Sequence, residues 1–190
     1  VLSSYNSSTH GSGYNAFISV DVANIDLSAT STISSQSTKV IVYDHNINGY
    51  VTFKATSGNI VMFDASCRYL EFKYIYLNGN NQTSVKGVDC YNFEATSTSS
   101  TLSVKVENCS AGGIYADGYA NITKGSISNC TSSRDGGGLY FRSTSTIDNL
   151  TVNNCKTTSG YGGGIYAYSS LSTISNSTIS GCSSQNGGGL

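Results

Sequence analysis

The sequence predicts an all-β fold, a single-stranded right-handed parallel β-helix of about six to seven turns, with about 25 residues per turn and essentially no helix. The first observation is a glycine phrase in which two or three glycines precede Ile or Leu. Its copies begin at Gly112, Gly136, Gly162 and Gly187. No segment shows the 3.6-residue apolar period of a helix, and short alternating segments with glycine corners favour β-strands.

A second phrase alternates with the first and ends in Cys. Two apolar residues five positions apart are followed by Asn or Gly and then Cys, as in Ile122, Ile127 and Cys130, and the phrase recurs at 147–155 and 174–182. The first apolar residues after the glycines are separated by steps of 28, 26, 25, 26 and 25 residues: Ile60, Val88, Ile114, Leu139, Ile165 and Leu190. Length varies mainly in the loop before the glycines, which is expected when stacked strands keep their register while one corner is free to vary.

In chain order, residues 1–38 are expected to form an irregular lead-in with the first strand or strands, and residues 39–190 the β-helix. Apolar and polar residues alternate across 16–22 in the manner of a strand, and strand-like runs follow at 39–43 and 50–54. The repeats are clearest over 58–190. Because the last glycine phrase stops at Leu190 without a polar cap, we expect the coil to continue beyond it.

The two phrases together resemble the G-G-A-[ILV] and F-x-x-N repeats of polymorphic outer-membrane-protein β-helices and, more loosely, the pectin-lyase-like superfamily. The resemblance covers Gly58 to Leu190 and departs from the pattern by placing Cys beside the Asn. It implies the β-helix fold. For activity it implies only that an outer face is the place to look, since many pectin-lyase-like proteins cleave acidic polysaccharides there, often with calcium.

Composition excludes several classes of protein. The net charge is −1 and 11% of residues are charged, so no basic patch predicts nucleic acid as a partner. No stretch reaches the roughly 18–20 apolar residues of a membrane span. The cysteines lack the C-x-x-C pairs of a zinc site, and no motif indicates another metal or a cofactor.

Six cysteines indicate an oxidising compartment and therefore an extracellular or cell-surface protein. Four share one ladder position, Cys109, Cys130, Cys155 and Cys182, while Cys67 and Cys90 fall elsewhere in the repeat. Stacked positions about 4.8 Å apart lie within the Cα separation that a disulfide accepts. The simplest pairing joins Cys109 to Cys130 and Cys155 to Cys182, with Cys67 and Cys90 unassigned. The alternative is a buried column of free thiols acting as small apolar residues.

Asn-x-Ser/Thr sequons indicate N-glycosylation if the source is eukaryotic. The stronger candidates are Asn149, Asn176, Asn121, Asn81 and Asn6, and the weaker ones are Asn108 and Asn129. Asn108 and Asn129 precede ladder cysteines, where Asn is expected to hydrogen-bond either its own backbone or the next amide at a corner of the coil.

Strand alternation predicts an outward column of Tyr115, Tyr140 and Tyr166, with Asp117 and Arg142 as neighbours on adjacent turns. The column either stabilises the strand face or forms a surface for a glycan, a partner or a neighbouring filament.

No catalytic residue is predicted. Glycoside hydrolysis needs two carboxylates roughly 5–9.5 Å apart, and the acids are scattered over the repeat. Asp64 with Asp89, or Asp117 with Asp135, would meet only through loop geometry. The histidines, His10 and His45, lie in polar stretches before the regular repeats.

The sequence therefore favours a structural extracellular glycoprotein, a segment of a β-helical fibre, surface appendage or adhesin that self-associates end to end or continues in a longer chain. One alternative is a polysaccharide lyase or hydrolase of the pectin-lyase-like class. Another is a module that binds glycan or ice through flat Thr and Ser faces, although Thr-x-Thr columns do not repeat in register in the sequence.

Overall fold

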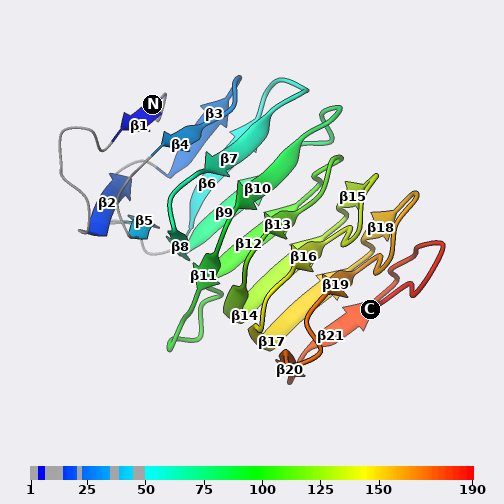
Figure 1. Cartoon of the computed structure of the whole chain (residues 1–190). Coiled ribbons are helices and arrows are strands. Elements are labelled where there is room, and N and C mark those ends of the chain that lie inside the picture. The colour runs from blue at the N-terminus through cyan, green and yellow to red at the C-terminus, as the bar shows by residue number, and fades with distance from the viewer. Residues whose placement is uncertain (1–3, 7–14, 21–22, 35–38, 45–49) are drawn as a thin grey trace.

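The chain winds into a parallel β-solenoid of about 6 turns with about 26 residues per turn (Figure 1). The computed structural model describes residues 4–6, 15–20, 23–34, 39–44 and 50–190, and these contain strands and no helix. The predicted fold class is therefore confirmed.

The strands are short, as one turn of such a coil requires. They are β1 (Ser4–Asn6), β2 (Asn15–Val20), β3 (Asn24–Leu27), β4 (Thr32–Ser34), β5 (Lys39–Asp44), β6 (Val51–Ala55), β7 (Val61–Ala65), β8 (Tyr69–Lys73), β9 (Ile75–Asn78), β10 (Lys86–Cys90), β11 (Phe93–Ala95), β12 (Val104–Glu107), β13 (Ile114–Ala116), β14 (Ala120–Ser128), β15 (Thr131–Ser132), β16 (Leu139–Phe141), β17 (Thr146–Asn153), β18 (Lys156–Thr157), β19 (Ile165–Ala167), β20 (Thr173–Ser175) and β21 (Thr178–Ser180).

Every strand pair is parallel, and each strand lies on the equivalent strand of the turn before. Sheet A stacks β1, β4, β7, β10, β13, β16 and β19. Sheet B has two arms that share the long strands β14 and β17. The first arm stacks β2, β5, β8, β11, β14, β17 and β20, and the second stacks β3, β6, β9, β12, β14, β17 and β21. The pair β15 and β18 forms a third, two-stranded sheet.

The coil includes strands from the segment that the sequence assigned to a lead-in. Ser4 of β1 pairs with Thr32 of β4, and Thr32 pairs with Asp64 of β7. Strands β2 and β3 likewise pair in parallel with β5 and β6. Stacking thus begins before residue 39, on strands whose repeat phrases are too divergent to recognise by spacing.

A left-handed corner explains why Asn or Gly precedes the ladder cysteines. Asn108, Asn129, Asn154 and Gly181 have φ values of 57°, 53°, 53° and 62°. Among L-residues Asn tolerates this conformation best, and Gly has no Cβ to oppose it. The side chains also form a column, since Asn129 Nδ2 donates to Asn108 Oδ1 at 3.3 Å. Of the two expected partners, the residue's own backbone and the next amide, the structure shows the second, because these bonds join side-chain amides of neighbouring turns.

The core changes character along the axis. In the first turns, four buried phenylalanines form an edge-to-face chain, with ring centroids separated by 4.9, 5.0 and 5.3 Å: Phe53, Phe63, Phe72 and Phe93. In the later turns the interior is filled mainly by Ile, Val, Leu and Cys beside glycine, and Phe141 is the buried phenylalanine there, so sheets A and B pack mostly through smaller side chains.

The two sequence phrases meet inside the core. A β-carbon added at Gly138 would lie 2.7 Å from the carbonyl oxygen of Gly164, 3.1 Å from Cys155 Sγ and 3.1 Å from Val152 Cγ1. Gly113 and Gly164 have the same kind of neighbours one turn away. The glycine before Ile or Leu is therefore needed because the carbonyl oxygen of the next turn's glycine, together with the thiol of the following Cys, occupies the space that a side chain would take.

Substituting Ala for Gly138 should lower the free energy of unfolding by roughly 1–3 kcal/mol, because the added methyl overpacks the Gly138–Cys155 contact. Chemical denaturation followed by circular dichroism measures the change. The control is Gly189→Ala, whose added methyl would meet only Ile179 Cγ2 at 3.5 Å, an ordinary contact distance. Equal destabilisation by the two substitutions would contradict the assigned role of Gly138.

Candidate functional sites

Three stacked tyrosines line the outer face of sheet A. The rings of Tyr115 and Tyr140 lie 4.2 Å apart at 5°, and those of Tyr140 and Tyr166 lie 5.6 Å apart at 13°. Strands β13, β16 and β19 place them in register. Tyr140 is only 6% exposed, so the ring faces are covered by one another.

Both ends of the tyrosine stack are also covered. The guanidinium of Arg134 lies 4.6 Å, and the Lys86 ammonium 5.2 Å, from the ring centre of Tyr115. Tyr161 lies 6.2 Å from Tyr166 at the other end. Burial, followed by the interaction with Tyr140, raises the pKa of Tyr115 to about 12. This arrangement suits a neutral stabilising column better than an open platform on which a sugar ring stacks.

Acidic residues also meet through the register of sheet A. Asp89 on β10 pairs directly with Asp64 on β7, and Lys86 Nζ lies 2.6 Å from the Asp89 carboxylate. Our expectation that Asp64 and Asp89 would meet only through loop geometry is therefore wrong. The expected neighbours Asp117 and Arg142 form an ion pair of 3.1 Å, which is exposed and therefore contributes little to stability.

A second acidic pair on sheet B was missed by the sequence analysis. Glu71 on β8 pairs in register with Glu94 on β11. Lys39 Nζ lies 2.7 Å from Glu71 and 2.5 Å from Glu94, and Tyr119 donates to Glu94 at 2.6 Å. Glu71 is 7% exposed. The missed signal was positional, because Glu71 follows Leu70 as Glu94 follows Phe93, and Leu70 and Phe93 are ladder partners.

The charge state of this cluster follows from its contacts. Burial raises the pKa of Glu94, but hydrogen bonds from Lys39 and Tyr119 and the charge of Lys39 outweigh it, so the pKa lies below its ordinary value. Glu94 is therefore held as a carboxylate, and the ammonium groups of Lys39 and Lys73 together balance the charges of Glu94 and Glu71. A carboxylate pair that is ion-paired in this way has no free acid and base with opposed roles, which argues for a structural or binding site.

Beside this cluster the outer face of sheet B is hollowed. The hollow has a volume of about 270 Å³ and is lined by Phe17, Ile41, Tyr43 and Lys73. Lys73 contacts Glu71 at 3.3 Å, so the hollow and the acidic cluster adjoin.

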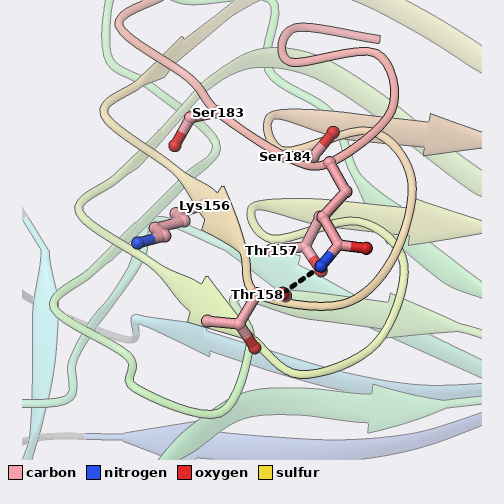
Figure 2. Close-up of a pocket in the computed structure, with 6 residues that line it drawn as sticks. Lys156, Thr157, Thr158, Ser183 and Ser184 are labelled. Carbon is pink, nitrogen blue, oxygen red and sulfur yellow. Dashed lines mark hydrogen bonds between the residues drawn. The ribbon is translucent and has the colours of Figure 1, made fainter.

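A polar hollow of about 280 Å³ lies near the C-terminal end, between the loops that follow Cys155 and Cys182 (Figure 2). Its lining consists of Lys156, Thr157, Thr158, Ser183, Ser184 and Gln185. Lys156 and Ser183 lie on one side of it in Figure 2, and Gln185 Nε2 donates to the carbonyl of Thr158 at 3.4 Å. These residues belong to the corner whose length varies between repeats.

All six cysteines are thiols in the structure, and five of them are buried. The ladder cysteines Cys109, Cys130, Cys155 and Cys182 stack inside the coil. Interaction with Cys109 and burial raise the pKa of Cys130 well above its ordinary value. Burial likewise raises the pKa of Cys67 to about 11 and that of Cys90 well above its ordinary value, and Cys67 is among the charges acting on Cys90. The raised pKa values favour the thiol form of Cys67, Cys90 and Cys130, and the disulfide pairing stays a prediction.

The sequons differ in what their side-chain amides contact. Asn108 and Asn129 donate to Asn78 and Asn108 within the corner column, and Asn176 donates to Asp148 at 2.7 Å. Asn149 is exposed, and its Nδ2 has no hydrogen bond within the described part of the chain. Asn81 is exposed, Asn121 is half-buried and Asn6 ends β1, its side chain lying outside the described residues.

Hydroxyl columns cover the outer face of sheet B in the last three turns. Ser126, Thr151 and Thr178 pair in one column, and Ser128, Asn153 and Ser180 pair in the next. Hydroxyl residues therefore do repeat in register, although the pattern in these two columns is Ser, Thr and Asn and contains no Thr-x-Thr. Ser180 donates to Asn153 at 2.5 Å, so part of this polarity is satisfied between turns.

Three further expectations concern metals, membranes and histidines. In the residues that the structure describes, no three His, Cys, Asp or Glu side chains come together as metal ligands, and no helix is long and apolar enough to cross a membrane. His10 and His45 lie outside the described residues.

No family model matches the chain, and neither a curated protein nor a solved structure does. The likeness to polymorphic outer-membrane-protein and pectin-lyase-like repeats thus remains a resemblance of phrases. The chain is a parallel β-solenoid. Its function has to be inferred from its outer surfaces, which are the tyrosine stack, the acidic cluster with its hollow, and the hydroxyl columns.

The substitution Lys39→Met keeps an aliphatic side chain and removes the ammonium that Glu71 and Glu94 share. We expect a loss of roughly 1–3 kcal/mol near pH 7, because two adjacent carboxylates, one of them buried, lose their counter-charge. In the unmodified protein the lowered pKa of Glu94 contributes stability above its unfolded pKa, and this stability is lost as the pH falls through the folded pKa.

The deficit of the Lys39→Met variant should therefore persist from about pH 7 down to the unfolded pKa of Glu, about 4.3, and shrink below it, as urea denaturation at about pH 7, 5 and 3 would measure. The matched control is Lys54→Met, because Lys54 is exposed on β6 and has no ion pair among the described residues. A deficit that is equal in the two variants, or constant with pH, would count against the shared-ammonium role.

Proposed function

We propose that this protein is an extracellular structural glycoprotein, a segment of a β-helical fibre, surface appendage or adhesin, in which turns stack end to end. The observation that carries the proposal is the unbroken parallel register of sheets A and B (Figure 1). Each turn stacks on the strand edges of the turn before it and exposes equivalent strand edges to the turn after it. A strand edge of this kind is a template for another strand, so extension by further turns or another copy satisfies its backbone groups.

The side chains of the last described turn support stacking. Ile174 and Ile179 pack against the core but are only partly buried. Leu171 and Leu190 are 77% and 61% exposed. Another turn laid on β20 and β21 would bury this apolar surface, which stabilises association by about 25 cal/mol per Å².

The proposal predicts self-association of the 190-residue chain through this turn. Sedimentation velocity should show species larger than the monomer, and electron microscopy should show rods longer than one copy. The double substitution Leu171→Lys and Leu190→Lys should shift the population toward monomer, because stacking would then bury two unpaired ammonium groups.

The control for self-association is Tyr91→Lys, compared with each single leucine substitution, because it adds one ammonium at an aromatic residue that is 56% exposed and lies earlier in the chain. Compact monomers alone in the unmodified protein, or equal effects of the two charge additions, would contradict stacking through this turn.

The extracellular part of the proposal predicts two covalent marks in the native material. Peptide mapping should show an N-glycan at Asn149, whose amide is exposed and unengaged, before Asn176, whose amide is held by Asp148. Alkylation without reduction should find fewer than six thiols, with Cys109 joined to Cys130 and Cys155 to Cys182. Six alkylatable thiols and unmodified sequon peptides would contradict it.

The alternative of a glycan-binding module is favoured by one specific observation, the hollow beside the Glu71 and Glu94 pair. An adhesive fibre and a glycan-binding surface are compatible, because loops and outer strands are free to bind while the core supports the coil.

A further inference from the structure

The hollow on the first arm of sheet B has an apolar floor where an outward strand face is normally polar. Phe17 on β2, Ile41 on β5 and Glu71 on β8 pair in one column. Ile41 is nevertheless only 7% exposed. Phe17 is 61% exposed and meets Tyr43 edge to face, with ring centroids 6.2 Å apart. Two aromatic rings and one aliphatic side chain thus form a small apolar surface on the outside of the coil.

Charged groups border this surface on one side. Lys73 Nζ lies 3.3 Å from Glu71, and its side chain is 45% exposed, so it has donor directions left for a ligand. Glu71 also contacts Lys39, which bridges to Glu94. The border holds two ammonium groups and two carboxylates, and their charges cancel.

The lining restricts the chemistry of a ligand. A purely apolar ligand would cover Lys73 and Glu71 and leave their charges desolvated, which is costly. An anion or a cation would find a border of zero net charge and gain little from it. A sugar ring has one C–H face that packs on aromatic side chains and an edge of hydroxyls that both donate and accept hydrogen bonds. Lys73 can donate to such hydroxyls and the Glu71 carboxylate can accept from them.

We propose that this hollow binds one ring of a neutral glycan, with the C–H face against Phe17, Ile41 and Tyr43 and the hydroxyl edge against Lys73 and Glu71. The volume of about 270 Å³ lies just below the range of pockets for drug-sized ligands and fits a single ring. Its biological meaning rests on the proposed role as an extracellular adhesive protein, for which the hollow supplies a ligand class.

The test is a titration of the full 190-residue chain with neutral oligosaccharides ending in glucose, galactose, mannose or N-acetylglucosamine, followed by NMR and calorimetry. At least one should bind, and Phe17→Ala and Lys73→Ala should each weaken it by about tenfold or more, equivalent to about 1.4 kcal/mol. Because the sugar is uncharged and the charges that border the hollow cancel, the affinity should be the same at roughly 50 and 500 mM salt.

Matched controls are Tyr91→Ala, an exposed aromatic residue elsewhere, and Lys54→Ala, an exposed lysine on the other arm of sheet B. Both should bind as the unmodified chain does. Phe17 and Lys73 are exposed enough for their substitutions to leave the fold intact, which circular dichroism checks.

Three results would overturn the proposal. They are no binding of any neutral sugar, binding only of uronate or sulfated sugars that salt abolishes, and a change of sedimentation with Phe17→Ala, which would assign the hollow to a second copy. Self-association through the last turn is measured separately, so loss of sugar binding leaves the stacking proposal standing, and the reverse also holds.

Discussion

Every turn of the coil lies directly on the preceding one, at the spacing of about 4.8 Å that hydrogen-bonded strands impose. This constraint brings like residues together: Tyr115 on Tyr140, Asn108 on Asn129, Cys130 on Cys155. Where the repeated residue is apolar or neutral, stacking stabilises the coil. Where it is a carboxylate, neighbouring turns repel, and the structure supplies a lysine at each such place, Lys86 beside Asp89 and Lys39 between Glu71 and Glu94.

The same constraint separates the chain into two chemical halves. The earlier turns combine a core of edge-to-face phenylalanines with an outer face of charged and aromatic side chains. The later turns combine a core of mainly aliphatic residues, thiols and glycine with the tyrosine stack outside sheet A and hydroxyl columns outside sheet B. Side chains of different chemistry therefore adjoin on the earlier turns, whereas each later turn resembles the last.

The later turns were predictable because two phrases mark each one. The strand type, the tyrosine column and the neighbours Asp117 and Arg142 follow from the spacing between Gly112 and Leu190. The earlier turns lack the phrases, so neither the pairing of β1–β4 nor the contact of Lys39 with Glu71 and Glu94 was visible. Those contacts join residues far apart in sequence. Because the loops between them differ in length, the spacing in the sequence does not show which residues pair, and only the register of the folded strands does.

The direction of the ladder hydrogen bonds has a mechanical consequence. Backbone bonds between turns lie across the strands and therefore along the axis of the coil. Tension along the axis pulls on these bonds directly, and since each turn holds only its neighbours, the coil yields by peeling from an end. Tension along the strands, applied at the loops before the glycines, would instead shear whole ladders at once. A load attached to the side of such a rod is thus held more firmly than one attached to its tip.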